Sequence, residues 1–128
     1  MTLALLDSSV LVSALHPPDS LHERGARLLR RAEEEFEPAV TAPVVAEVYT
    51  VARRTGGPGL ARDLAGRVVA SYPLLAIPKT AVERALASAD GLSLVDAMLL
   101  RHAEMARGKV ATLDERLARA AGDCALTP

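Results

Sequence analysis

The chain has 128 residues, of which 50% are hydrophobic and 24% charged, with a formal net charge of −1. This length suits one core, so we expect residues 1–128 to form a single domain. Two Tyr, one Phe and no Trp argue against a platform for stacked bases. The lone cysteine, Cys124, excludes an internal disulfide and a multi-thiolate metal site. No apolar run approaches the ~20 residues of a membrane span and no signal-like start is present, so we expect a soluble, cytoplasmic protein.

Strands and helices are expected to alternate along the chain. The apolar run 3–6 predicts a buried strand ending at Asp7, and a helix over 8–15 should stop at His16-Pro17-Pro18. Further helices are expected over 21–36, 44–54, 60–71, 80–89, 93–107 and 114–121, with a glycine-rich loop over 55–59 and the 80–89 helix ending at Asp90-Gly91. Short strands are expected within 37–41, 74–77, 109–112 and 124–126. This order predicts an α/β three-layer sandwich, with a central parallel sheet of about five short strands and helices on both faces.

Four carboxylates stand near the carboxyl ends of these strands. Asp7 and Asp114 follow predicted strands, whereas Glu47 and Asp96 lie near the starts of predicted helices. Each has an ordinary explanation as well. Asp7 and Asp114 are suited to cap a helix, Ser93-x-x-Asp96 fits a capping box, and Glu47 has a route to solvent at the edge of its helix. Because parallel strands end at one edge of a sheet, we expect the four carboxylates to converge there.

Converging carboxylates require shared protons or a cation. Two carboxylates about 4 Å apart repel by about 4 kcal/mol at an effective dielectric constant near 20. Oxygen ligands without His or Cys favour Mg²⁺ or Mn²⁺ over zinc. Ser9 and Thr112 adjoin two of the carboxylates and are placed to orient them or to hold ligand water. Such a metal centre suits phosphodiester hydrolysis by activated water and needs no nucleophilic side chain.

The basic residues provide candidate contacts for a phosphate backbone. With the four carboxylates set aside, the rest of the chain is net basic. Arg53 and Arg54 follow the helix of Glu47, and Arg101 lies in the helix of Asp96. We expect these three arginines to contact substrate phosphates, with an ordinary solvated surface as the alternative.

Four segments resemble, in order along the chain, the acidic motifs of PIN-domain ribonucleases: Asp7-Ser8-Ser9, Ala46-Glu47-Val48, Leu92-Ser93-Leu94-Val95-Asp96-Ala97 and Thr112-Leu113-Asp114. In size and coverage the chain is most similar to the VapC-type toxins of bacterial type II toxin–antitoxin pairs. The resemblance implies Mg²⁺- or Mn²⁺-dependent endonucleolytic cleavage of RNA, a homodimer, and inhibition by a small antitoxin protein.

The resemblance also implies a division of roles within the site. Asp7, Glu47, Asp96 and Asp114 would be the catalytic quartet, with the metal held by Asp7, Asp96 and Asp114. After Asp114 this chain continues with Glu115, where family members often have an Asp-Phe ending. The ligand role at this position is therefore open between Asp114 and Glu115.

Two other functions fit part of the pattern. A PIN-like binding module without activity would keep the fold, but it predicts the loss of one or more carboxylates. A phosphatase of the haloacid-dehalogenase type also begins with a strand that ends in Asp. It needs a second Asp two residues later, where this chain has Ser9, and its downstream Lys is not evident.

Overall fold

The computed structural model describes residues 1–88 and 91–128. Its strands are β1 (Leu3–Leu6), β2 (Glu37–Thr41), β3 (Leu74–Leu75), β4 (Lys109–Ala111) and β5 (Ala125–Leu126). Its helices are α1 (Ser8–Leu15), α2 (His22–Glu35), α3 (Ala42–Ser71), α4 (Lys79–Ala87), α5 (Leu94–Met105) and α6 (Glu115–Ala121). Within these residues the five strands form one parallel sheet in the order β3-β2-β1-β4-β5, which confirms the predicted α/β fold.

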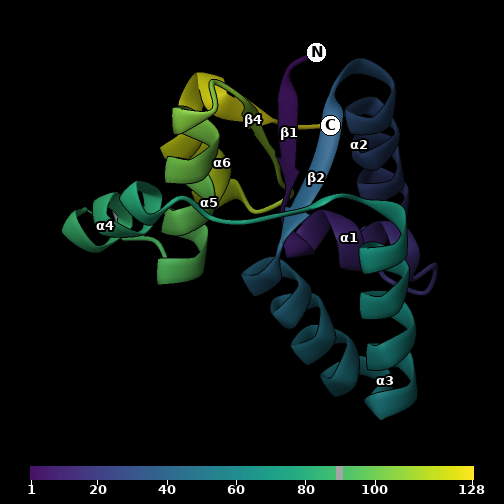
Figure 1. Ribbon diagram of the computed structural model, residues 1–128. Helices are drawn as coiled ribbons and strands as arrows, with labels where there is room; N and C mark the ends of the chain where they lie inside the picture. The colour runs from purple at the N-terminus through teal and green to yellow at the C-terminus, as the bar shows by residue number, and fades with distance from the viewer. Residues whose placement is uncertain (89–90) are drawn as a thin grey trace.

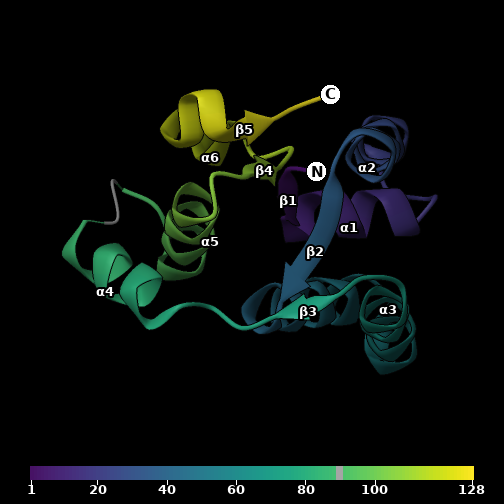
Figure 2. The same ribbon diagram turned by 45° about the horizontal axis from the view of Figure 1, so that its top comes forward.

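Helices cover both faces of this sheet. Figures 1 and 2 show α1 and α2 on one face and α5 on the other, while α3 extends from the end where β2 stops. Coverage on both faces explains why the central strands are continuous apolar runs rather than alternating ones. Leu5 and Leu6 in β1 and Val110 in β4 are accordingly fully buried.

The strands run in the same direction, so their carboxyl ends meet at one place in the molecule. In Figure 1 this is the lower end of β1 and β2, where α1 and α3 begin. β1 lies between β2 and β4 in the sheet, with Leu5 opposite Ala39 on one side and Val110 on the other. A residue that follows β1 therefore has neighbours from both adjacent strands.

The largest difference from the expected elements lies in α3. The predicted loop over 55–59 is only a kink between two helical arms. Gly57 has φ 87° and ψ −177°, a conformation that side-chain-bearing residues avoid, and Gly56 also leaves the helical region. Pro58 then starts the second arm, where its missing N–H breaks no helical hydrogen bond. Glycine and proline thus bend the helix here without opening a loop.

Other boundaries differ by a few residues. β3 is two residues long instead of four because it pairs only with Val40 and Thr41, the last two residues of β2. α4 ends at Ala87, and the expected continuation to Ala89 with a stop at Asp90 lies outside the described residues. Among the helices that the structure describes, none has the length and apolarity needed to cross a membrane.

The packing of α1 against α2 depends on Gly25. A Cβ atom at this position would lie 1.9 Å from Ser13 Oγ and 2.8 Å from Ser13 Cβ, so a new side-chain rotamer would not relieve the clash. We expect Gly25→Ala to lower the free energy of unfolding by about 1–3 kcal/mol, measured by urea denaturation. Gly66→Ala is the matched control, because a Cβ there meets nothing within 4 Å. The control should be neutral or stabilising by up to about 1 kcal/mol, and equal losses in both variants would contradict the packing argument.

Candidate active site

Asp7 is the buried centre of the candidate site. It follows β1 directly, and its exposed fraction is 4%. Its Oδ1 accepts a hydrogen bond from the backbone N–H of Ser8 at 2.8 Å. Its Oδ2 accepts from Ser9 Oγ at 2.7 Å and from Thr112 Oγ1 at 2.8 Å. Three donors therefore compensate the burial of this carboxylate, one of them as the cap of α1.

The two hydroxyls that hold Asp7 also anchor the segment after β4. Ser9 Oγ accepts from the backbone N–H of Leu113 at 3.0 Å, and Thr112 Oγ1 accepts from that of Asp114 at 2.9 Å. Each hydroxyl thus donates to the carboxylate and accepts from the chain. Ser9 and Thr112 thereby fix both the orientation of Asp7 and the position of the turn that carries Asp114.

Glu47 and Asp96 join Asp7 from two other elements. One carboxylate oxygen from each of the three residues lies within 4.8 Å of the others. Glu47 comes from the first arm of α3, where its Oε1 accepts from Ser8 Oγ at 3.2 Å. Asp96 comes from the first turn of α5, which Ser93 caps by accepting from the Asp96 backbone N–H at 3.2 Å. Among the described residues, no Lys or Arg forms an ion pair with any of the three.

This grouping makes ionisation of the carboxylates unfavourable. Burial raises the pKa of Asp96 to about 6, and the charges of Asp7 and Asp114 add to the increase. Burial, followed by the charges of Asp96 and Asp7, also raises the pKa of Glu47, against the hydrogen bond from Ser8. Three partly desolvated oxygen donors without a neutralising side chain fit a hard divalent cation.

Asp114 lies beside this group but is not one of the three carboxylates that meet. It caps α6, because its Oδ1 accepts from the backbone N–H groups of Arg116 at 2.9 Å and Leu117 at 3.4 Å. Its charge contributes to the raised pKa of Asp96. Its neighbour Glu115 is exposed in the first turn of α6. The structure thus brings Glu47, rather than Asp114, into one group with Asp7 and Asp96, and the metal set of Asp7, Asp96 and Asp114 stays a prediction.

A hollow of about 410 Å³ adjoins Glu47. Pro43, Glu47, Thr50 and Arg54 line it from one face of α3, and Ser8 and Val95 complete its wall. Sequence reasoning missed Ser8 and this wall, although the spacing 43, 47, 50, 54 is that of a single helix face.

The three predicted substrate arginines have different surroundings. Arg54 lines the hollow beside Glu47, whereas Arg53 is exposed and does not line it. Arg101 donates to Glu104 Oε1 at 2.8 Å and to the backbone carbonyl of Ser88 at 3.1 Å. Of the three arginines, Arg54 is thus the one that shares a hollow with Glu47, and no ion pair of its guanidinium occurs among the described residues.

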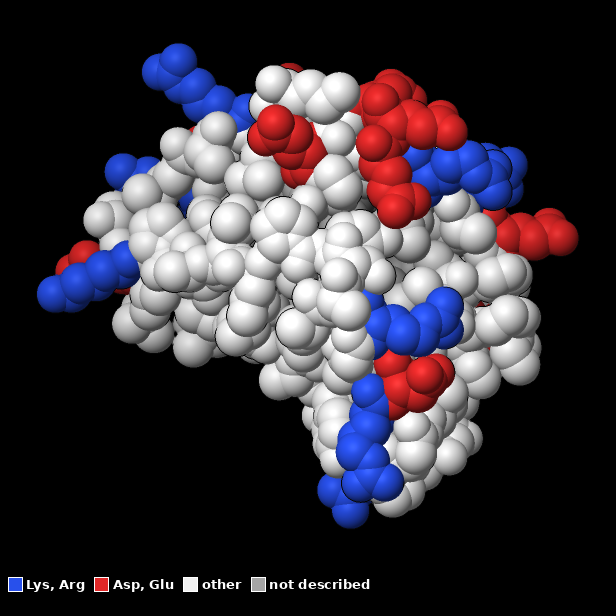
Figure 3. Space-filling view, turned by 45° about the vertical axis from the view of Figure 1, so that its right-hand side comes forward, with Lys and Arg blue, Asp and Glu red and all other residues white. Residues whose placement is uncertain are grey.

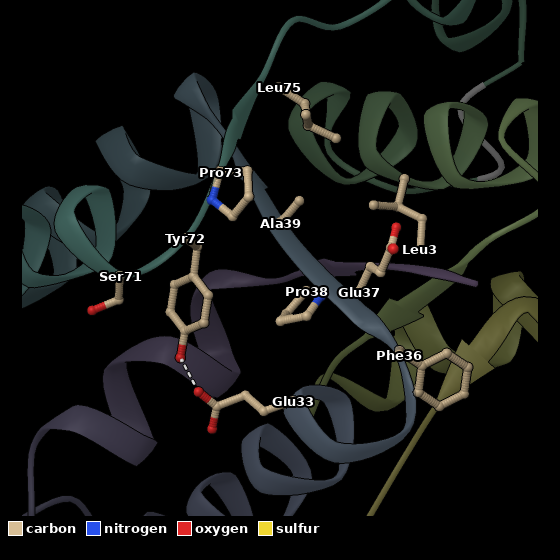
Figure 4. Close-up of a pocket in the computed structure, with 10 residues that line it drawn as sticks. All are labelled: Leu3, Glu33, Phe36, Glu37, Pro38, Ala39, Ser71, Tyr72, Pro73 and Leu75. Atoms are coloured by element: carbon tan, nitrogen blue, oxygen red, sulfur yellow. Dashed lines mark hydrogen bonds between the residues drawn. The ribbon is translucent and has the colours of Figure 1, made fainter. Parts of the chain in front are cut away.

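A second cavity, of about 500 Å³, lies away from the carboxylates. Figure 4 shows it beside the first half of β2, where Tyr72, just after α3, and Glu33 of α2 point toward each other. Tyr72 Oη donates to Glu33 Oε2 at 3.2 Å, and burial together with the Glu33 charge raises the pKa of Tyr72. No residue of the carboxylate group lines this cavity. Its size therefore says nothing about the chemistry at the end of β1.

Residues 4–123 match the family model of the PIN domain. This range includes Asp7, Glu47, Asp96 and Asp114. The chain belongs to the PIN domain family. This membership confirms the resemblance seen in the acidic motifs and argues against a phosphatase of the haloacid-dehalogenase type. The chain matches no curated protein sequence at a significant level.

Several solved structures share the fold. One is VapC20 of Mycobacterium tuberculosis, described as a toxin that cleaves the sarcin-ricin loop (TM-score 0.77, 20% identity, 91% of this chain and 94% of that one). Another is a toxin–antitoxin complex from Klebsiella pneumoniae (TM-score 0.67, 22% identity, 98% and 97%). A third is VapBC2 of Rickettsia felis bound to a promoter DNA fragment (TM-score 0.68, 10% identity, 91% and 92%).

The carboxylate group should reduce the stability of the metal-free protein above pH 6. The pKa of Asp96 is about 6 in the folded protein against an ordinary value of 3.8, so its contribution to stability is fully present below pH 3.8 and lost as pH rises through 6. Asp96→Asn removes this penalty. In EDTA at pH 7.5 we expect a higher Tm for Asp96→Asn than for wild type, with the difference shrinking toward pH 4. Asp63→Asn, an exposed carboxylate paired with Arg67 in α3, should show no such pH-dependent gain.

Thr112 can be tested separately from the charged groups. Thr112→Val keeps the shape of the side chain but removes the donor to Asp7 and the acceptor for the Asp114 N–H. Because Thr112 is fully buried, we expect a loss of about 1–3 kcal/mol in the free energy of unfolding by urea denaturation. Thr50→Val on the exposed side of α3 is the control, and a similar loss there would contradict a specific role for the Thr112 hydroxyl.

Proposed function

We propose that this protein is a metal-dependent endoribonuclease and the toxin of a toxin–antitoxin pair. The observation that supports it most is the meeting of three carboxylates, from the end of β1, from α3 and from α5, none of which has an ion pair among the described residues. PIN family membership supports nuclease chemistry. RNA is the proposed substrate because VapC20, which shares the fold, is described as cleaving the sarcin-ricin loop.

The side chains of the site divide into ligands and supporting groups. Asp7, Glu47 and Asp96 would hold Mg²⁺ or Mn²⁺, with Asp114 completing the acidic quartet beside Asp96. When bound, the ion would activate water and neutralise charge on the phosphate and the leaving oxygen. Asp114 is a better candidate than Glu115, because its charge, and not that of Glu115, affects the pKa of Asp96.

The remaining residues of the site position the substrate and the ligands. Ser9 and Thr112 keep Asp7 oriented through their hydrogen bonds to its Oδ2. Ser8 does the same for Glu47. Arg54 would bind a phosphate next to the one that is cut, since it lines the hollow beside Glu47. Arg53 would add a weaker contact from the same helix, and Arg101 the weakest, because its guanidinium already donates to Glu104 and to the Ser88 carbonyl.

The proposal includes partners. The Klebsiella pneumoniae and Rickettsia felis structures support an antitoxin protein as the inhibitor. A homodimer is also proposed, and exposed Leu86 on α4 and Leu94 on α5 are apolar surface that it could cover. Residues 1–128 would act as one nuclease domain in the cytoplasm, where its RNA substrate and antitoxin are made.

The proposal predicts RNA cleavage that depends on the metal and on the carboxylates. Purified wild type should cut RNA in Mg²⁺ or Mn²⁺ and not in EDTA, as measured by the release of labelled fragments. Asp7→Asn and Asp96→Asn should lower the rate at least about 100-fold, because each removes a charged ligand. Asp63→Asn should cut like wild type, since this carboxylate lies on the second arm of α3.

Asp96→Asn is the more informative of the two site variants, because it should fold at least as stably as wild type. Cleavage that survives in EDTA or in both site variants would contradict the metal-nuclease proposal. A stable wild-type protein that cuts neither RNA nor DNA with any divalent metal would favour the binding-module alternative.

A further inference from the structure

The hollow beside Glu47 contains apolar side chains that reach solvent next to a charged centre. Val51 is 39% exposed, and Ala46 is also exposed on the first arm of α3. Pro43 adds to this wall from the start of α3, and Val95 comes from α5. In Figure 1 the first arm of α3 and the first turn of α5 both lie at the lower end of the sheet. Aliphatic groups from two elements thus remain partly exposed in one hollow.

The charged groups of this hollow lie at separate levels along the first arm of α3. Glu47 belongs to the carboxylate group, and Arg54 follows about two helical turns later, a rise of about 10 Å along the helix. The sequence has no acidic residue within four positions of Arg54. Val51 lies between the two charged groups on this arm. The hollow therefore extends from the carboxylates past an aliphatic wall to an arginine that has no ion pair among the described residues.

The two hydroxyl groups of the hollow already have acceptors within the protein. Thr50 Oγ1 donates to the Ala46 carbonyl at 3.0 Å, and Ser8 Oγ donates to Glu47 Oε1 at 3.2 Å. Between Glu47 and Arg54 the lining therefore offers aliphatic contact area and few groups that demand a fixed polar partner. Such a wall suits the face of a flat ring.

An RNA strand that is cut at the carboxylates extends from them in both directions. Each phosphate of the strand is bonded on either side to a ribose that carries a base, so a nucleoside must lie directly beside the phosphate being cut. The hollow adjoins the carboxylates through Glu47. Its volume of about 410 Å³ is within the range of about 300–1,000 Å³ that small-ligand sites have, and such sites are mostly apolar with a few polar groups. A nucleoside thus fits this hollow in size, position and chemistry.

We propose that the hollow is the subsite for one nucleoside that flanks the scissile phosphate, with its base against Ala46, Val51 and Val95. This inference rests on the proposed ribonuclease function and adds to it a place where the protein contacts a base. Arg54 would bind the phosphate on the far side of that nucleoside. The described residues that line the hollow include no aromatic one, so the base is held by burial of aliphatic surface and not by stacking on a ring.

The first test measures binding without cleavage. The four nucleoside 5′-monophosphates are added in Mg²⁺ to the wild-type protein, and the valine methyl signals are followed by NMR. We expect the signals of Val51 and Val95 to shift, whereas Val69, an exposed valine on the second arm of α3, should not respond. Ribose 5-phosphate keeps the sugar and the phosphate but has no base. Equal shifts with ribose 5-phosphate would contradict the proposed base contact.

The second test fills the hollow. Ala46→Leu adds bulk at an exposed position of the wall, and Ala70→Leu is the matched control at an exposed position on the second arm of α3. Both variants should keep the Tm of wild type, because leucine is a good helix former. The Mg²⁺ concentration for half-maximal cleavage should also be unchanged in Ala46→Leu, which would show that the neighbouring Glu47 is undisturbed.

The substrates are an RNA oligonucleotide with one mapped cleavage site and two abasic versions, each lacking the base on one side of that site. For wild type and Ala70→Leu, we expect removal of the base on one of the two sides to lower kcat/KM about tenfold. Ala46→Leu should cut the intact RNA about tenfold less efficiently than wild type, but that abasic RNA less than about twofold less efficiently. The penalty for the missing base should therefore disappear in Ala46→Leu only.

The outcomes separate this inference from the proposed function. If wild type cuts RNA but neither abasic version lowers kcat/KM, or if Ala46→Leu weakens cleavage of intact and abasic RNA equally, the nucleoside subsite is wrong and the nuclease stands. If wild type cuts no RNA, the proposed function fails and the inference fails with it. If acetyl-Leu-Glu amide shifts Val51 and Val95 and the nucleotides do not, the hollow binds a protein segment instead.

Discussion

The whole site depends on how one buried carboxylate is held. Asp7 follows β1, the central strand of the sheet. The segments that follow β1, β2 and β4 therefore surround it. Burying a charged group would be costly without donors, and the structure provides three of them at 2.7–2.8 Å. Two of these donors are hydroxyls that also bind the backbone after β4. The same hydrogen bonds therefore compensate the charge of Asp7 and align the two segments that carry Asp7 and Asp114.

The carboxylates around Asp7 are in an electrostatically unfavourable environment. Glu47 and Asp96 approach Asp7 from α3 and α5, and their pKa values rise because burial and mutual repulsion oppose their charges. Each carboxylate alone has an ordinary structural role, but grouping the three lowers the free energy of unfolding. Stability therefore does not explain why they lie together. The fully buried core of Leu, Val and Ala residues provides the stability that this cluster reduces. A bound cation would remove the repulsion between these carboxylates. Their grouping is therefore better explained by function than by folding.

The sequence predicted much of this because topology does most of the positioning. Parallel strands separated by helices place every strand end at one edge, so Asp7, Glu47 and Asp96 could be expected to meet without any coordinates. For Asp114 the sequence offered two roles, a helix cap and a metal ligand, and the structure shows the cap, because its carboxylate accepts from two backbone N–H groups of α6. The pairing of Arg101 with Glu104, three residues later in α5, is within reach of sequence reasoning, whereas its contact with the Ser88 carbonyl depends on how the end of α4 packs against α5. Local patterns show which residues reach the edge, but packing decides which way each side chain turns.

The shortage of aromatic residues limits how such a site would recognise the proposed RNA substrate. With only three aromatic residues in the chain, bases would find few rings to stack on, so contacts with phosphates would supply most of the binding energy. On the face shown in Figure 3, charged side chains lie toward the margins, including basic ones on the projecting arms of α3, and the centre is largely uncharged. Phosphate contacts of this kind carry no base sequence. In the proposed nuclease, selectivity among RNAs would therefore come from the shape of the surface beside Arg54 and the carboxylates rather than from contacts with phosphates.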